Sequence, residues 1–170
     1  MIKVYIKDFH EGERSEKFSL AVFAYYYGIE SPTILRGKHG KPYLDGKNLH
    51  FSLSHSGGVI FLAVAEQELG MDAERIDREV NYLPILKRYP ALLELHIENT
   101  EEFLRAWTKV ESNVKRIGGS LAVYGKKIKC VNGEIALGEA SPVWCESKCV
   151  EGFFVSVCAK IPDEIAFLRL

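Results

Sequence analysis

Two acidic residues, Asp72 and Glu74, are separated by one residue in a stretch, 70–74, that is typical of a β-strand. Side chains two residues apart in a strand point to the same face, so these carboxylates are expected side by side. Paired carboxylates repel each other unless a cation lies between them, and Mg²⁺ is held by one or two carboxylates together with substrate phosphates. A solvated strand edge, with Arg75 as the local counter-charge, is the alternative for this pattern taken alone.

A third acidic residue, Glu111, lies in a stretch that predicts an amphipathic helix over residues 100–117. Glu111 and Lys115 are four residues apart and lie on one flank of the apolar stripe, where they could line a cleft. Taken alone, such a pair is more often a plain surface ion pair. The apolar positions recur every three or four residues and are expected to be buried: Phe103, Trp107, Val110, Val114 and Ile117.

Two further segments are candidates for binding an anion. The first is a basic, glycine-rich loop over residues 34–43, with Arg36, Lys38, His39 and Lys41. The second is Ser54-His55-Ser56-Gly57-Gly58, expected as the loop between strands 49–53 and 59–65. Small residues let backbone N–H groups approach an anion there, and a histidine can add a charge or a hydrogen bond. Neither segment has Walker A or G-x-S-x-G spacing, so solvated surface charge and an ordinary turn are the alternatives.

The elements that must position these residues alternate between strand and helix patterns. Residues 82–97 contain Pro84 and Pro90 and predict short helical turns. Asn99 and Glu102 form the pattern of a capping box for the helix over 100–117. The other expected elements are a strand over 2–6, a helix over 14–28 ended by Gly28, and strands over 126–131, 134–137 and 153–161 with an Asn132-Gly133 turn. The expected fold class is α+β, with a largely antiparallel sheet.

Composition narrows the function classes. The chain has 170 residues and a formal net charge of −1, which suits one compact domain and argues against a general nucleic-acid or membrane-surface binder. The longest apolar run, 59–65, is shorter than the roughly 20 residues of a membrane span. Residues 1–8 lack a signal-peptide pattern, so a cytoplasmic location is expected. The cysteines lack zinc-site spacing and are expected to be thiols in half-buried strands: Cys130, Cys145, Cys149 and Cys158.

In their order along the chain, these segments resemble the 4′-phosphopantetheinyl transferases, particularly the type that activates nonribosomal peptide synthetases. The resemblance covers about residues 38–121 and extends loosely to the strand near 153–159. The matching motifs are Gly40-Lys41-Pro42, the stretch over 51–57, Gly70-Met71-Asp72-Ala73-Glu74, and the stretch over 103–112 with Lys115 and Gly118. A G-x-D-x-E motif combined with W-[ST]-x-x-E-[SA]-x-x-K at this separation is specific.

The resemblance implies transfer of the phosphopantetheine arm of coenzyme A to a serine of an apo acyl or peptidyl carrier protein, leaving adenosine 3′,5′-bisphosphate. Asp72, Glu74 and Glu111 would gather Mg²⁺, with Mn²⁺ as an alternative. Lys115 would contact the diphosphate, and Glu111 would also help to deprotonate the carrier serine. Mg²⁺ and coenzyme A are therefore the expected cofactor and substrate.

The resemblance also assigns a site for the 3′-phosphate of coenzyme A, formed by Lys41, Ser54 and His55. One departure is Val110, where the family usually has a lysine immediately before the helix glutamate. This departure leaves a non-catalytic module that binds coenzyme A or a carrier protein as an alternative function. A metal-dependent phosphohydrolase is a third alternative.

Length and resemblance together imply one transferase domain, 1–170, made of two pseudo-two-fold-related halves near 1–67 and 68–170. Each half would be a small, mainly antiparallel sheet packed with helix, with the site in the cleft between them. This arrangement permits a monomer, and a dimer is the alternative. The carrier protein is expected to dock on residues 82–93, through Lys87 and Arg88 and an apolar residue such as Leu86 or Leu92. Irregular packing of this segment into the core is the alternative.

Overall fold

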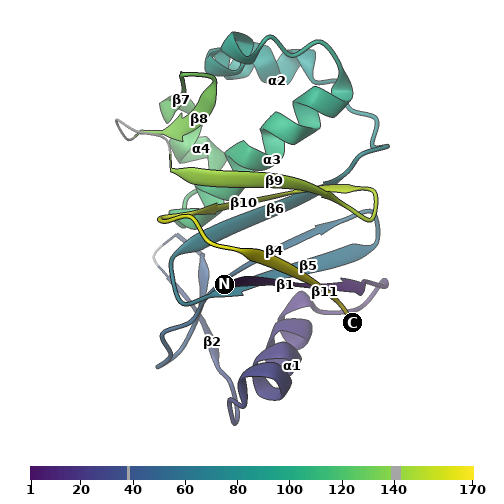
Figure 1. The fold of residues 1–170 in the computed structure, drawn as a ribbon, viewed down its shortest axis with the longest axis vertical. Helices are drawn as coiled ribbons and strands as arrows, with labels where there is room; N and C mark the ends of the chain where they lie inside the picture. Colours follow the sequence, from purple (N-terminus) through teal and green to yellow (C-terminus); the bar gives the residue numbers. More distant parts are fainter. Residues whose placement is uncertain (38, 139–142) are drawn as a thin grey trace.

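The computed structural model describes residues 1–37, 39–138 and 143–170, so Lys38 of the basic loop lies outside the described residues. Two small sheets are stacked between helices, which confirms the expected α+β class (Figure 1). Helix α1 (Ser15–Tyr27) lies at one end of the molecule, and α2 (Leu83–Arg88) and α3 (Thr100–Arg116) lie at the other. Among the described residues, no helix is long and apolar enough to cross a membrane.

The first sheet has four strands in the order β11 (Ile165–Arg169), β1 (Ile2–Asp8), β5 (Val59–Ala65) and β4 (His50–Ser56). Strand β11 is parallel to β1, and the other neighbours are antiparallel. Residues Val22 and Phe23 of α1 pack on one face of this sheet, and Gly28 ends α1 in the left-handed conformation, as expected.

The second sheet has three antiparallel strands in the order β6 (Leu69–Arg75), β10 (Phe153–Ala159) and β9 (Trp144–Val150). One face packs on the four-stranded sheet, through alternate residues such as Met71 and Val157. The other face of β6 and β10 is covered by α3, which explains why every residue of β10 is buried. The two-fold relation expected between halves 1–67 and 68–170 remains a prediction.

Helix α3 packs unusually close to β6. A Cβ atom on Gly70 would lie 1.9 Å from the carbonyl oxygen of Ser112, so only glycine allows this approach. Asn99 caps the helix by accepting a hydrogen bond from the backbone N–H of Glu102 at 2.9 Å, as the capping box predicts. The close packing at Gly70 brings the helix against the strand that carries Asp72 and Glu74.

The remaining elements are short. Residues 82–97 form α2 and the 3₁₀ turn η1 (Pro90–Leu95), as the prolines predict. The Asn132-Gly133 turn is confirmed, since both residues have positive φ (53° and 78°). The other short elements are β2 (Ile34–Arg36), β3 (Pro42–Leu44), α4 (Leu121–Tyr124), η2 (Gly125–Lys127), β7 (Ile128–Val131) and β8 (Glu134–Leu137).

Two expectations were wrong. Ser54, His55 and Ser56 do not form a loop: they continue β4, which pairs with β5 up to Ser56 opposite Val59. The turn is Gly57-Gly58 alone, and it closes because both glycines have positive φ (54° and 76°). Cys145 and Cys158 are not thiols, because strand pairing places them directly opposite each other on β9 and β10, where they form a disulfide. Cys130 and Cys149 are free thiols, as expected, but Cys149 is exposed and not half-buried.

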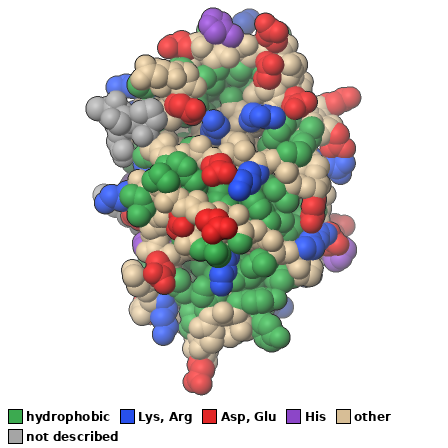
Figure 2. All heavy atoms as spheres, viewed as in Figure 1, with side chains coloured by type: hydrophobic (Ala, Val, Ile, Leu, Met, Phe, Trp, Pro, Cys, Tyr) green, Lys and Arg blue, Asp and Glu red, His purple; other side chains and the backbone are tan. Residues whose placement is uncertain are grey.

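The surface carries both signs of charge. Figure 2 shows Lys and Arg side chains interspersed with Asp and Glu over one face of the molecule. This distribution agrees with the net charge of −1 and with the sequence argument against a general polyanion binder.

Candidate functional site

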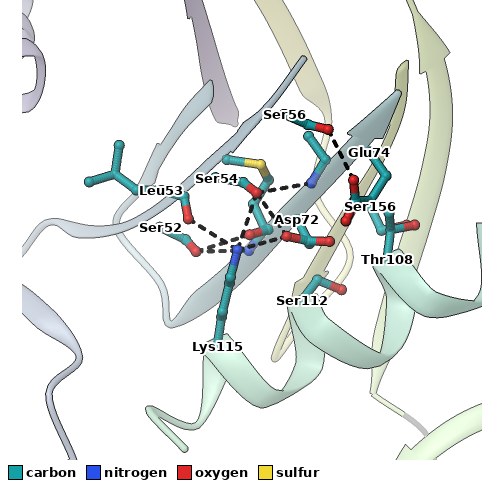
Figure 3. Close-up of polar contacts among 12 residues, drawn as sticks. Ser52, Leu53, Ser54, Ser56, Asp72, Glu74, Thr108, Ser112, Lys115 and Ser156 are labelled. Atoms are coloured by element: carbon teal, nitrogen blue, oxygen red, sulfur yellow. Dashed lines mark hydrogen bonds and ion pairs between the residues drawn. The ribbon is translucent and has the colours of Figure 1, made fainter. Parts of the chain in front are cut away.

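The site is organised where β4 and β6, edge strands of the two sheets, lie side by side (Figure 3). Alternate residues of β4 are serines whose side chains point to β6, and each hydroxyl oxygen accepts a hydrogen bond from a backbone N–H of that strand. The three pairs are Met71 N to Ser52 Oγ at 2.9 Å, Ala73 N to Ser54 Oγ at 3.3 Å, and Arg75 N to Ser56 Oγ at 3.2 Å. We call Ser52, Ser54 and Ser56 the serine row.

Asp72 is the most buried acidic residue at this joint, with 4% of its surface exposed. Its Oδ1 accepts hydrogen bonds from Ser54 Oγ at 2.8 Å and from Lys115 Nζ at 2.7 Å (Figure 3). Its Oδ2 is buried and has no hydrogen-bond partner among the described residues. A buried carboxylate oxygen without a partner lowers the stability of the folded state. Oδ2 of Asp72 is therefore available to bind a cation or to accept a hydrogen bond.

Glu74 lies two residues further along β6 and points to the same face as Asp72, as the spacing predicts. Its Oε2 accepts a hydrogen bond from Ser56 Oγ at 2.9 Å, and its Oε1 forms an ion pair with Arg78. Arg75, the counter-charge considered from sequence, pairs instead with Asp77. The two carboxylates of the D-x-E motif are therefore both held by the serine row.

Glu111 lies on α3 one turn before Lys115 and is partly buried. Burial is the main cause that raises the pKa of its carboxyl to about 6, and repulsion from Asp72 and Glu74 adds to it. Attraction to Lys115 and a hydrogen bond from Trp107 act in the opposite direction. The structure thus brings Glu111 close enough to Asp72 and Glu74 for the three carboxylates to repel one another.

The three acidic residues suit a divalent cation in donor type and charge, and the unpartnered Oδ2 of Asp72 is a free ligand atom. Within residues 1–37, 39–138 and 143–170, however, no group of three His, Cys, Asp or Glu side chains is arranged to hold a metal ion. Lys115 instead supplies the positive charge at Asp72. The metal triad therefore remains a prediction that the chemistry of these residues fits.

A cavity of about 380 Å³ opens beside β4, lined by Phe51, Leu53 and His55 of the other face of the strand and also by Ser52. Its lining is basic: Arg36, His39, Lys41, His55 and Lys115 all contribute to it. Gly118 and Gly119, which follow α3, and Ser15 and Glu16 of α1 complete part of the wall. Lys115 belongs to both regions, because its ammonium group binds Asp72 while its side chain lines the cavity.

The three residues expected at the 3′-phosphate are divided between these regions. His55 lines the cavity and stacks on Phe9, with 5.9 Å between ring centroids. Ser54 points the other way, to Asp72, because successive strand residues alternate in direction. Lys41 lines the cavity, but its ammonium group donates to the carbonyl oxygens of Leu69 and Arg116, at 3.2 and 2.5 Å. Burial lowers the pKa of Lys41 below its usual value.

The expected docking segment needs one correction. Leu86 is 5% exposed and Leu92 is fully buried, and both pack in the core around α3, so neither can contact a partner. Each lies on the inner side of its short helical turn. Lys87 and Arg88 are exposed, as are the apolar side chains of Leu83 and Leu93.

Sequence reasoning missed the part that Ser52 and Ser56 play. The S-x-S-x-S alternation over residues 52–56 was a usable signal, because period-two serines on a strand share one face. Val110, where the resembling family usually has lysine, is buried in the core around α3. At this position the chain uses the helix for packing rather than for a surface charge.

Comparison with known proteins supports the motif-based resemblance. The 4′-phosphopantetheinyl transferase AcpT of Salmonella typhimurium is 36% identical over 98 residues, covering 52% of this chain and 51% of the relative. A 4′-phosphopantetheinyl transferase of Bacillus subtilis is 32% identical over 107 residues, covering 57% and 47%. The transferase Sfp of Bacillus subtilis strain 168 is 28% identical over 142 residues, covering 74% and 62%. No family model matches the chain.

The chain spans about half the length of the AcpT protein and of the Bacillus subtilis transferase that it matches. The resemblance to 4′-phosphopantetheinyl transferases read from the motifs is confirmed, and the relatives are named as transferase enzymes. The matched proteins carry that name in several bacteria, including Aneurinibacillus migulanus.

Proposed function

We propose that this chain transfers the 4′-phosphopantetheine group of coenzyme A to a serine of an apo carrier protein, giving the holo-carrier and adenosine 3′,5′-bisphosphate. The observation that carries the proposal is the position of Lys115, whose ammonium group binds the buried Asp72 of the acidic cluster while its side chain lines the basic cavity. Coenzyme A would use both regions. The basic cavity would attract the anionic phosphates of its nucleotide end, and the acidic cluster would lie at the diphosphate, where the reaction occurs. The relatives' names support the same reaction class.

The basic cavity would take the nucleotide end of coenzyme A. His55 and Arg36 are exposed on its wall and can donate to a phosphate, and His39 lies beside them. Lys41 would contribute positive charge near the 3′-phosphate while it stays bonded to the end of α3. Ser54 would act there only indirectly, because its hydroxyl proton is used by Asp72.

Lys115 would stabilise the diphosphate, since its ammonium group lies between Asp72 and the cavity. Asp72, Glu74 and Glu111 are the residues that would hold Mg²⁺, or Mn²⁺ in its place. When bound, such an ion supplies electrostatic stabilisation of the charge that develops on the leaving phosphate.

Glu111 is the proposed general base. Its carboxylate stands on α3 one turn before Lys115, so it lies near the proposed diphosphate contact and can accept the serine proton directly or through a water molecule. In the transfer, a bond forms between the carrier serine oxygen and the β-phosphorus of coenzyme A, and the bond from that phosphorus to the bridging oxygen breaks. The serine proton goes to Glu111, and the electron pair of the broken bond leaves with adenosine 3′,5′-bisphosphate.

The test is intact-mass spectrometry of an apo carrier protein incubated with this chain, coenzyme A and Mg²⁺. Transfer adds one phosphopantetheine mass to the carrier and releases adenosine 3′,5′-bisphosphate in equal amount. Binding of coenzyme A without any mass change would instead favour the non-catalytic module. Breakdown of coenzyme A in a sample without carrier would favour a phosphohydrolase.

A further inference from the structure

The serine row contains three hydroxyl groups in equivalent positions but with different second contacts. Each oxygen accepts a hydrogen bond from a backbone N–H of β6, and each hydroxyl has only one proton to donate. Ser52 donates this proton to the carbonyl oxygen of Met71 at 3.3 Å. Ser54 donates to Asp72 at 2.8 Å, and Ser56 donates to Glu74 at 2.9 Å.

We propose that Ser54 and Ser56 are positioning residues that fix the carboxylates of Asp72 and Glu74 for cation binding. The proposal rests on the proposed function, because it assigns these carboxylates to the metal of the transfer reaction. The backbone N–H that each serine accepts orients the hydroxyl, so its proton is directed at the neighbouring carboxylate. Hydrogen bonds to ionised acceptors are about twice as strong as neutral ones, so this contact restrains the carboxylate more than a neutral partner would.

The orientation that results is informative at Asp72. Ser54 and Lys115 both donate to Oδ1, and this leaves Oδ2 buried and unpartnered among the described residues. Such an arrangement costs free energy unless a cation or donor completes it. At Glu74, Ser56 of β4 donates a hydrogen bond to Oε2. The other oxygen, Oε1, forms the ion pair with the exposed side chain of Arg78.

The experiment measures Mn²⁺ binding by the enhancement of water-proton relaxation, with Mn²⁺ as the only added ligand. Three single variants are compared with the wild type: Ser52→Ala, Ser54→Ala and Ser56→Ala. Loss of an outer partner of a metal ligand lowers metal affinity by roughly 10- to 100-fold, and we expect this range for Ser54→Ala and Ser56→Ala. Ser52→Ala removes an equivalent bond to β6 without touching a carboxylate, so it should bind Mn²⁺ as the wild type does.

Thermal unfolding separates positioning from general stability. All three variants leave one β6 N–H without its hydroxyl partner, so all three should lose stability, and Ser56→Ala should lose least because its hydrogen bond is exposed. Ser56→Thr keeps the hydroxyl and suits a strand, and it should restore Mn²⁺ affinity. If Ser54→Ala does not fold, Ser56→Ala and Ser56→Thr still test the proposal. Ser56 is only partly buried, so the fold should tolerate its substitution.

Equal Mn²⁺ affinities in the three alanine variants would overturn the positioning role. A wild-type chain that does not bind Mn²⁺ would overturn both that role and the metal assignment. A wild-type chain that shows the expected Mn²⁺ pattern but leaves every tested carrier unmodified would refute the proposed transfer while supporting the positioning role.

Discussion

The two faces of β4 differ in how completely the fold prepares them. On the face toward β6, Ser54 and Lys115 donate hydrogen bonds to the buried carboxylate of Asp72, and Ser56 donates to Glu74. On the other face, His55 and the basic residues Arg36 and His39 line an open cavity and are exposed to solvent. The acidic side therefore has its geometry before any ligand binds, whereas the basic side can adjust to the anion that enters.

This difference predicts unequal costs for substitutions on the two sides. Removing a pre-organised group that acts on the reacting atoms should lower activity strongly, because no other group can take its place. Removing one exposed cation from a group of several should weaken binding less, because the neighbouring cations still attract the same phosphate.

Asp72→Ala should give the largest effect. It removes a carboxylate that holds Lys115 and has one oxygen free for a cation, so transfer should fall by at least about 100-fold, the size expected for a group that stabilises transition-state charge. The measurement is the rate of carrier modification by intact mass. Asp72→Asn is the matched control for shape: it keeps the side-chain volume but loses the charge, and it should be about equally inactive. Near-normal transfer by either variant would remove Asp72 from the reaction.

His55→Ala and Lys41→Ala should act on the basic side with smaller effects. A lost hydrogen bond to a charged group costs about 1.5–3 kcal/mol, so His55→Ala should raise the KM for coenzyme A by roughly 10- to 100-fold. The effect should be much weaker with 3′-dephospho-coenzyme A, which lacks the phosphate that His55 is proposed to contact. Equal losses on both substrates would place His55 elsewhere.

Lys41→Ala sharpens the comparison, because the ammonium group also binds the carbonyl oxygens of Leu69 and Arg116. We expect a lower melting temperature in addition to the KM effect, whereas His55→Ala should leave the melting temperature nearly unchanged. If Lys41→Ala lowers stability and affects both forms of coenzyme A equally, Lys41 supports the end of α3 and does not bind phosphate.

The residues of the acidic side were predictable because their signals are local. A period of two in the strand and of 3.6 in the helix placed Asp72 with Glu74 and Glu111 with Lys115. Gly70 allows the strand and the helix to meet, because it has no side chain to keep α3 away from β6. The family resemblance, carried by the same motifs, then indicated that the strand and the helix should meet.

What the sequence did not reveal depends on neighbours far away in the chain. Ser54 looked like part of a loop, and only pairing with β5 up to Ser56 makes it a strand residue that faces Asp72. Strand β9 is half-buried at a sheet edge and has no strong apolar alternation, so it was not predicted. The disulfide of Cys145 and Cys158 follows from the register of that unpredicted strand with β10.

Glu111→Gln should change the pH dependence of stability. The folded-state pKa of about 6 lies above the ordinary value of 4.5, so folding takes up a proton between these pH values. The free energy of unfolding should therefore fall as pH rises from about 4.5 to 6, by up to about 2 kcal/mol, and stay lower above pH 6. The Glu111→Gln side chain does not titrate, so the free energy of unfolding of this variant should not fall in this way.

Urea unfolding with a chelator present tests this expectation. Glu111→Gln should match the wild type near pH 4 and be more stable than the wild type at pH 7 to 8. Parallel pH profiles for the two proteins would show that the Glu111 carboxyl is neither buried nor held near the other carboxylates. A chelator is needed because a bound cation would lower the pKa of Glu111 and hide the effect.

The smallest effect concerns the proposed docking surface, which lies away from both faces of β4. Lys87 and Arg88 are exposed at the end of α2, and Leu83 and Leu93 supply exposed apolar surface in place of the buried Leu86. Reversing both charges should raise the KM for an acidic carrier only several-fold, since exposed charges contribute about 0.2–1 kcal/mol each. It should also weaken the salt dependence of that KM, because less long-range attraction is left to screen.

The KM for coenzyme A should stay unchanged in Lys87→Glu/Arg88→Glu, because neither residue lines the basic cavity. A second double variant, Lys47→Glu/Lys160→Glu, changes the net charge equally at exposed positions outside α2 and serves as the matched control. If both double variants raise the carrier KM alike, overall charge and not α2 attracts the carrier. If carrier kinetics are untouched in a well-folded Lys87→Glu/Arg88→Glu variant, this segment serves only to pack Leu86 and Leu92 against α3, and the carrier approaches Glu111 from another side.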